Sequence, residues 1–208
     1  MNHLIFSMVL MICGVGIAQA QTDDSVNILD ELNPFDPNIE EILQNFDEDY
    51  EADTGESASL PGFMIPFGQT DRESSCFRQS CPLWVQVVRS SQVMYVYENG
   101  SLVFTWKVST GTPGSETPNF DRNPNGRIYN RYTSKKHPGG DYKGLGNMPY
   151  AVFIHAGFAI HGTAEINWKK LGRKASHGCV RLHPDHAFYF NQQVRSLGVR
   201  NVWITVQE

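Results

Sequence analysis

Three short β-prone segments follow one another between residues 83 and 109, and they most constrain the fold of this chain. Residues 83–89 and 92–98 are rich in β-branched and aromatic side chains and are separated by a Ser90-Ser91 turn. Asn99-Gly100 is a two-residue hairpin signal that leads into residues 102–109. The pattern predicts an antiparallel meander of three strands.

The rest of the carboxyl-terminal part adds a second hairpin, a helix and a last strand. Residues 151–155 and 158–161 read as the hairpin, and residues 201–207 as the strand. Pro184 starts a predicted helix over 184–197, which Gly198 ends. Residues 110–149 read as loop, and a loop of that length in a compact domain is usually functional. We therefore predict a mainly β domain with one or two helices.

The first twenty residues resemble a secretory signal. Residues 4–17 are almost unbroken apolar sequence, and Ala18-Gln19-Ala20 offers small residues for cleavage, although no Lys or Arg precedes the apolar run. A retained transmembrane anchor is the alternative, but the span is too short to favour it. We expect an exported protein, secreted or periplasmic, without a stable membrane anchor after cleavage.

Charge divides the remainder into an acidic arm and a basic domain. Residues 21–60 hold thirteen of the 22 Asp and Glu and no Lys or Arg. Residues 61–208 hold the other nine acids and all 17 Lys and Arg, a net charge of +8. A basic domain favours an anionic partner, and export argues against nucleic acid.

Residues 21–70 therefore read as an acidic, largely flexible arm ahead of a domain at 71–208. One segment, 36–46, predicts a short helix because Asp36 can cap it and Pro37 fits its first turn. Its apolar residues fall on one face; they are Ile39, Ile42, Leu43 and Phe46. The helix is either transient within a flexible arm or docked, on a partner or across the active site of the basic domain.

The cysteines divide into a pair and a single thiol. Cys13 belongs to the signal, and an oxidising compartment favours a disulfide between Cys76 and Cys81, with reduced thiols or pairing between chains as alternatives. Cys179 is then left as a free thiol, which in an exported protein indicates a reactive group.

The sequence around Cys179 predicts a nucleophile. Ser176-His177-Gly178-Cys179 places an imidazole and a glycine beside the sulfur, and a second histidine, His161, precedes Gly162 and Thr163. A thiol attacks carbonyls as its thiolate, which a neighbouring imidazole can generate. We expect an open groove in which a carbonyl reaches the sulfur; the alternative is a buried, inert Cys179.

These motifs resemble the signature of the L,D-transpeptidase catalytic domain (YkuD-type), over residues 82–208. Ser109-Thr110-Gly111 with Thr117-Pro118, Met148-Pro149-Tyr150 and Val202-Trp203-Ile204 resemble its other recurring stretches. The resemblance implies a β-sandwich-like fold that acts on peptidoglycan stem peptides.

The resemblance also implies the role of each site residue. Cys179 is the expected nucleophile and His161 the general base, while His177 either assists or holds the turn. The Gly162 carbonyl would orient the His161 ring, and the N–H groups of His177, Gly178 and Cys179 would form an oxyanion hole. The expected substrate-binding residues are Arg181, Ser176, Thr163 and Tyr150.

The expected reaction is acyl transfer from a tetrapeptide stem, with loss of its terminal D-alanine. An amine of another stem would give a 3-3 crosslink, and a lysine of a wall-anchored protein would give covalent anchoring. Water would make the enzyme an L,D-carboxypeptidase, and a D-amino acid would give exchange.

Neither a cofactor nor a metal is expected. A zinc site built from His161, His177, Cys179, His183 and His186 is the rival chemistry, but their separations match no compact ligand pair. A non-catalytic wall-binding module is the remaining alternative.

Overall fold

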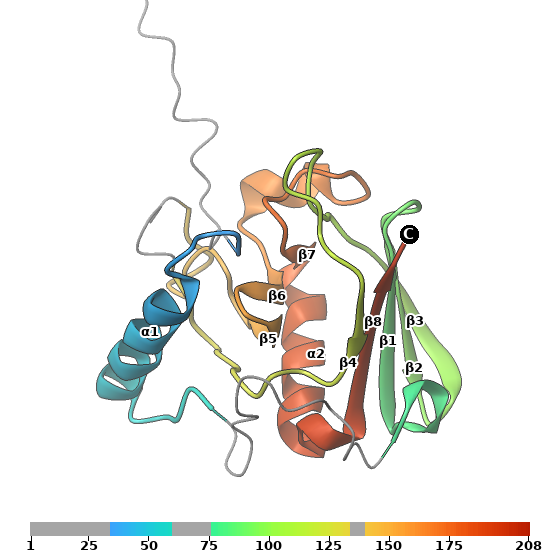
Figure 1. Ribbon diagram of the computed structural model, residues 1–208, viewed down its shortest axis with the longest axis horizontal. Helices are drawn as coiled ribbons and strands as arrows, with labels where there is room; N and C mark the ends of the chain where they lie inside the picture. The colour runs from blue at the N-terminus through green and yellow to red at the C-terminus, as the bar shows by residue number, and fades with distance from the viewer. Residues whose placement is uncertain (1–33, 60–75, 134–139) are drawn as a thin grey trace, which may run out of the picture.

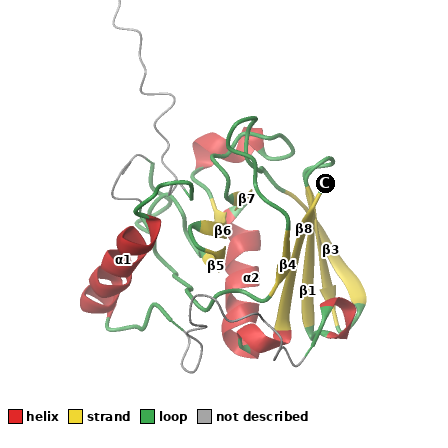
Figure 2. Cartoon of the chain, viewed as in Figure 1, coloured by secondary structure: helices red, strands yellow, loops and turns green. Residues whose placement is uncertain are grey.

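The computed structural model describes residues 34–59, 76–133 and 140–208, which form two β-sheets, two α-helices and short 3-10 turns (Figures 1 and 2). The predicted signal at 1–20 and two parts of the predicted arm, 21–33 and 60–70, lie outside these residues. Within the described ranges no helix is long and apolar enough to cross a membrane.

The larger sheet has five strands in the order β3-β2-β1-β8-β4. Strands β1 (Leu83–Val88), β2 (Val93–Glu98) and β3 (Ser101–Lys107) form the predicted antiparallel meander. Asn99 and Gly100 turn the chain with φ of 48° and 78°, values that glycine and asparagine tolerate best. The last strand, β8 (Val202–Gln207), returns parallel to β1.

The predicted loop at 110–149 contributes a strand that the sequence pattern does not reveal. Strand β4 (Phe120–Arg122) pairs antiparallel with β8 at the edge of the larger sheet. It is only three residues long, too short for alternation to be read from sequence. The meander, the hairpin and the helix were predicted within one or two residues, but this pairing was missed.

The smaller sheet has three strands in the order β5-β6-β7. Strands β5 (Val152–His155) and β6 (Phe158–Gly162) form the predicted second hairpin. Strand β7 (Val180–Leu182) lies parallel to β6. Between them the chain makes a 3-10 turn, η3 (Glu165–Lys170).

Helix α2 (Pro184–Leu197) contacts both β6 and β1 and stands between the two sheets in Figure 1. The His183 side chain caps it by accepting the Asp185 N–H at 3.3 Å, and Gly198 ends it at φ 77°. The main core joins the inner faces of both sheets to this helix; its strand residues are Leu83, Val85, Val87, Met94, Val96, Trp106, Val152, Ile154, Ile160, Val180, Leu182, Val202, Ile204 and Val206. The fold is therefore mainly β with two packed sheets, as predicted.

Helix α1 (Ile39–Thr54) is longer than the predicted segment and is packed on the domain (Figure 1). The helix begins at Ile39, so its N-cap residue is Asn38 and not the predicted Asp36, whose side chain accepts the Asn38 N–H at 3.0 Å. Its buried residues are Ile39, Leu43, Phe46 and Tyr50. Where the sequence predicts a largely flexible arm, residues 34–59 contain this helix, and its apolar face and several of its carboxylates have partners on the domain.

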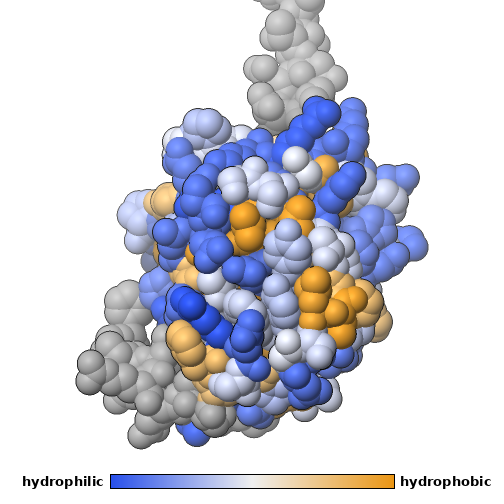
Figure 3. Space-filling model, turned by 90° about the vertical axis from the view of Figure 1, so that its right-hand side faces the viewer, coloured by the Kyte–Doolittle hydropathy of each residue, from blue (hydrophilic) through white to orange (hydrophobic). Residues whose placement is uncertain are grey.

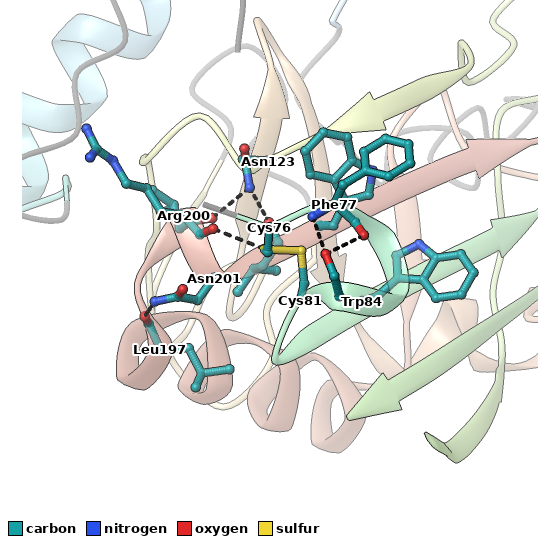
Figure 4. The surroundings of a disulfide bond; sticks show 12 residues. Cys76, Phe77, Cys81, Trp84, Asn123, Leu197, Arg200 and Asn201 are labelled. Carbon is teal, nitrogen blue, oxygen red and sulfur yellow. Dashed lines mark hydrogen bonds between the residues drawn. A yellow bond between two sulfur atoms is a disulfide. The ribbon is translucent and has the colours of Figure 1, made fainter. Parts of the chain in front are cut away.

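Cys76 and Cys81 form a disulfide, with an S–S distance of 2.04 Å, as the sequence predicts (Figure 4). The small loop that it closes contains the 3-10 turn η2 (Arg78–Ser80). The pair packs against Trp84 and Trp203, on the side of the larger sheet that faces away from the main core. The disulfide thus ties the chain entering β1 to the outer face of the sheet.

Strand β3 is the free edge of the larger sheet. It carries the exposed apolar side chains Leu102, Val103 and Phe104. Figure 3, which turns this side of the molecule toward the viewer, shows hydrophobic surface in separate patches among hydrophilic surface. Scattered apolar exposure of this kind is ordinary for a protein surface.

We predict that replacing both disulfide cysteines (C76S/C81S) lowers the free energy of unfolding by about 2 kcal/mol, because the bond restricts a short loop of the unfolded chain. Urea denaturation of the variant beside the wild type measures the change. The wild type treated with a reductant should lose a similar amount, and an unchanged urea midpoint in both would contradict the prediction.

Candidate active site

The two sequence motifs meet because β6 and β7 pair in parallel. His161 on β6 lies opposite Arg181 on β7, and Ile160 lies opposite Val180. Cys179 immediately precedes β7, so the same register places it beside Ala159. Residues that are partners in a parallel ladder point to the same face, and residues two apart on one strand do so as well. His161 and Cys179 therefore project from one face of the smaller sheet.

The burial of the neighbouring residues confirms that the two faces differ. Ile160, Val180 and Leu182 point into the main core, whereas Ala159 and Cys179 belong to a second apolar cluster on the opposite face. The other members of this second cluster are Ile39, Leu43, Phe46, Tyr50, Ala58, Tyr129, Tyr132, Met148, Ala151 and Phe153. We call this side of β5-β6-β7 the catalytic face.

His161 is oriented by the backbone, as the resemblance implied. Its Nδ1 lies 2.6 Å from the Gly162 carbonyl oxygen. A carbonyl can only accept, so Nδ1 carries the proton and Nε2 is left as the basic nitrogen. The ring is fully buried, and burial lowers the pKa of His161 to about 4. The imidazole is therefore neutral at physiological pH.

A network of hydroxyls holds the turn before Cys179. Ser176 Oγ donates to the Cys179 carbonyl at 2.5 Å and accepts the Gly178 N–H at 3.2 Å. Thr117 Oγ1 donates to the Gly178 carbonyl at 2.6 Å and accepts the Gly111 N–H at 3.0 Å. Gly178 itself has a φ of 124°, a conformation that L side chains rarely adopt.

This network includes one N–H group of the predicted oxyanion hole. The Gly178 N–H was expected to serve in an oxyanion hole, but it donates to Ser176 Oγ in this conformation. An amide that already has an acceptor must give it up before it can stabilise a developing oxyanion. The turn therefore has to shift if Gly178 is to contribute.

Cys179 is sealed from solvent, contrary to the open groove expected from the sequence. Its exposed fraction is 1%, and Sγ lies 3.5 Å from the Gly157 carbonyl oxygen. Burial raises the pKa of the Cys179 thiol to about 12. In this state the sulfur is a neutral thiol next to a neutral imidazole.

Part of the seal comes from residues ahead of the domain. Ile39, Leu43, Phe46 and Tyr50 of α1 share the apolar cluster of Cys179. Sequence analysis raised docking across the active site as an alternative, and the structure adopts it. Its anchor on the domain, Arg127, was not singled out, because a lone arginine in a loop-like stretch carries no pattern.

The predicted substrate-binding residues are mostly internal supports. Ser176, Thr163 and Arg181 are all buried, and the side chain of each makes a hydrogen bond inside the protein. Arg181 donates to the Ala175 carbonyl at 2.7 Å, and burial lowers the pKa of its guanidinium to about 10. In this conformation none of the three is presented to a substrate.

Tyr150 and His177 differ from those supports. Tyr150 is half-buried and its ring packs on Phe188 of α2, with centroids 5.1 Å apart. His177 is exposed on the surface beside the turn. Thr117, which the sequence suggested only as part of a recurring stretch, is the hydroxyl that fixes the Gly178 peptide.

Three other histidines among the described residues contact neighbouring groups of the fold. His183 caps α2, His186 stacks on Trp106 with centroids 4.7 Å apart, and His155 lies 3.1 Å from Arg122 Nη1 through its Nδ1. Among the residues that the structure describes, no group of three His, Cys, Asp or Glu is arranged to hold a metal.

The fold and the site define a mainly β protein with a histidine on β6 and a cysteine directly before the adjacent parallel strand β7. Residues 82–204 match the family model for the L,D-transpeptidase catalytic domain (YkuD), which is more than half of the chain, so the protein belongs to this family. A comparison with curated proteins gives no match.

Several solved structures are similar to the chain. An L,D-transpeptidase from Mycobacterium smegmatis is 20% identical (TM-score 0.46), with 62% of this chain and 60% of that chain covered. L,D-transpeptidase 3 from Mycobacterium tuberculosis is 19% identical (TM-score 0.47), with 62% of each chain covered. An L,D-transpeptidase from Stackebrandtia nassauensis is 21% identical (TM-score 0.47), with 68% and 62% covered. The matched region thus spans about 60% of the length of these structures.

The lowered pKa of His161 predicts a pH-dependent loss of stability. Because the unfolded histidine binds a proton near pH 6.5 and the folded one only near pH 4, the folded state loses stability as pH falls through this window. Between pH 7 and pH 4.5 this amounts to about 2 to 3 kcal/mol. Urea denaturation of wild type and H161Q at both pH values should show a smaller loss in the variant.

The matched control is H177Q, which makes the same substitution at an exposed site. It should keep the wild-type difference between the two pH values. Equal acid losses in H161Q and the wild type would contradict the assignment of a buried neutral imidazole.

Proposed function

We propose that the protein is an exported peptidoglycan L,D-transpeptidase that uses Cys179 as its nucleophile. The observation that carries the proposal is the common placement of Cys179 and His161 on the catalytic face, within a chain that belongs to the L,D-transpeptidase family. The partners would be peptidoglycan stem peptides in the cell wall. The +8 charge of residues 61–208 suits stems with free carboxylates.

The first half-reaction forms a thioester. His161 Nε2 takes the proton of the Cys179 thiol, and the thiolate attacks the carbonyl carbon of the third stem residue. Collapse of the tetrahedral intermediate breaks the bond to the terminal D-alanine, whose amine leaves with the proton from His161. The Gly162 carbonyl keeps Nε2 in the basic tautomer for both transfers.

The second half-reaction returns the acyl group to an acceptor. An amine of another stem attacks the thioester, gives its proton to His161, and restores the thiol with a 3-3 crosslink as product. A lysine of a wall-anchored protein would give anchoring by the same step. Both half-reactions are acyl transfers to and from sulfur, so the mechanism needs no cofactor.

Water as the acceptor makes the second candidate function, an L,D-carboxypeptidase. Exchange with a free D-amino acid would use the same acyl-enzyme. A non-catalytic wall-binding module would need none of this chemistry.

Incubation with a disaccharide-tetrapeptide, followed by mass spectrometry, tests the proposal. We expect crosslinked dimers and release of D-alanine from the wild type, and a loss of about 10³-fold or more in C179A. Tripeptide without dimers would identify the carboxypeptidase instead. C179A with wild-type turnover would refute the thioester mechanism.

A further inference from the structure

Residues 34–58, which include α1, lie over the catalytic face, and we call this segment the cover. Its first residues reach the turn that carries the nucleophile. A Cβ atom added to Gly178 would lie 2.8 Å from Pro34 Cγ and 3.2 Å from Phe35 Cε2. The cover therefore touches the residue directly before Cys179.

The cover also touches the other side of the sulfur. The Gly157 carbonyl oxygen is 3.5 Å from Cys179 Sγ. A Cβ atom added to Gly157 would lie 2.7 Å from both Pro34 Cα and Ile39 Cγ1. The cover thus contacts both glycines next to the sulfur. At each of them an added Cβ atom would come within 3 Å of an atom of the cover.

Aromatic packing holds α1 against the same face. Phe46 stacks on Tyr132 with ring centroids 4.2 Å apart, and Tyr50 meets Tyr129 edge-on at 5.3 Å. Leu43 is completely buried in the cluster that contains Cys179. Aromatic pairs of this geometry add to the stabilisation from the buried apolar area.

Charged groups fix the position of the helix. Arg127 of the domain donates to Asp47 at 3.0 Å and to Glu40 at 3.1 Å. The Tyr129 hydroxyl donates to the same Asp47. These partly buried contacts pair the acidic segment with the basic domain, in the sense that their opposite net charges favour.

The domain does not need the cover to complete its sheets. Both sheets are built from residues between Leu83 and Gln207, and the main core contains no residue of the cover. The cover and the domain are joined by side-chain contacts and by backbone hydrogen bonds, among them the bond from the Ile128 N–H to the Ala58 carbonyl at 2.9 Å. The cover can therefore leave without opening either sheet.

A docked cover is incompatible with the chemistry of the site. The attacking sulfur must come within about 3 to 3.5 Å of a substrate carbonyl carbon, and this space is occupied by Pro34, Phe35 and the apolar face of α1. We propose that residues 34–58 are an autoinhibitory segment that blocks Cys179 when docked and must be displaced from the catalytic face for turnover. This inference rests on the proposed function of Cys179.

The test opens the cover by substitution in the full chain. L43D/F46D places two carboxylates in the buried interface of α1. The matched control is Q44D/N45D, which adds the same charges to exposed positions of the same helix. Two readouts are taken: the rate at which a thiol reagent modifies the peptide that contains Cys179, and the turnover of a disaccharide-tetrapeptide.

We expect L43D/F46D to raise both rates by about tenfold or more over the wild type, because both scale with the open fraction. Q44D/N45D should stay within about twofold of the wild type. A cooperative thermal unfolding transition with its midpoint about 25 °C or more above the assay temperature would establish that the opened variant is folded.

A second pair of variants perturbs the interface of α1 less and is therefore less prone to misfold. E40Q/D47N removes the partners of Arg127 with almost no change of shape, and E41Q/E48Q removes two charges from the exposed side of α1. We expect about a two- to tenfold rise in both rates for the first pair and no change for the second.

The outcomes separate this inference from the function on which it rests. If Cys179 is labelled at the wild-type rate in folded L43D/F46D and in E40Q/D47N, residues 34–58 are not an autoinhibitory segment. Conversion of the tetrapeptide by the wild-type protein would in that case still support the transpeptidase. Fast labelling of the opened variants without any conversion of the tetrapeptide would instead overturn the proposed function.

Discussion

The parallel pairing of β6 with β7 is the constraint on which the site depends. It brings together two motifs separated by the 3-10 turn η3 and places His161 and Cys179 on one face of the smaller sheet. The opposite face is fixed by the main core through Ile160, Val180 and Leu182. A slip of one residue would exchange the two faces and put His161 into that core, so packing sets the register of the catalytic pair.

The state of the pair follows from its burial. Burial raises the pKa of the Cys179 thiol to about 12 and lowers the pKa of His161 to about 4, so the covered site favours the neutral form of both groups. Proton transfer from sulfur to nitrogen is therefore less favourable in the covered site than between the same groups in water. In the proposed mechanism, uncovering the site therefore has two effects. It admits the substrate, and it lets water and the substrate's polar groups solvate the ion pair of Cys179 and His161.

Sequence was most informative where short-range chemistry decides the structure. Alternating β-branched residues, Asn99-Gly100, Pro184 and Gly198 predicted the meander, the hairpin turn and α2, and the Ser176–Cys179 turn with His161 predicted the pair that the fold assembles. Sequence analysis missed the features that depend on contacts between segments far apart in the chain. The parallel partner of β1, the short β4 and the docking of α1 on Arg127 are tertiary events without a local pattern. The expectation of an open groove differs from the structure for the same reason, because residues 34–58, more than a hundred positions away in the chain, cover Cys179.

Thiol labelling of the native wild type across a range of sub-denaturing urea concentrations tests the central claim most directly. If the cover hides Cys179, the labelling rate should rise through a local opening whose urea dependence is clearly smaller than that of global unfolding. Both slopes are measured on the same protein, the second by its unfolding transition. Labelling that follows the global slope at every urea concentration would mean that the sulfur belongs to the core and that no cover opens above it.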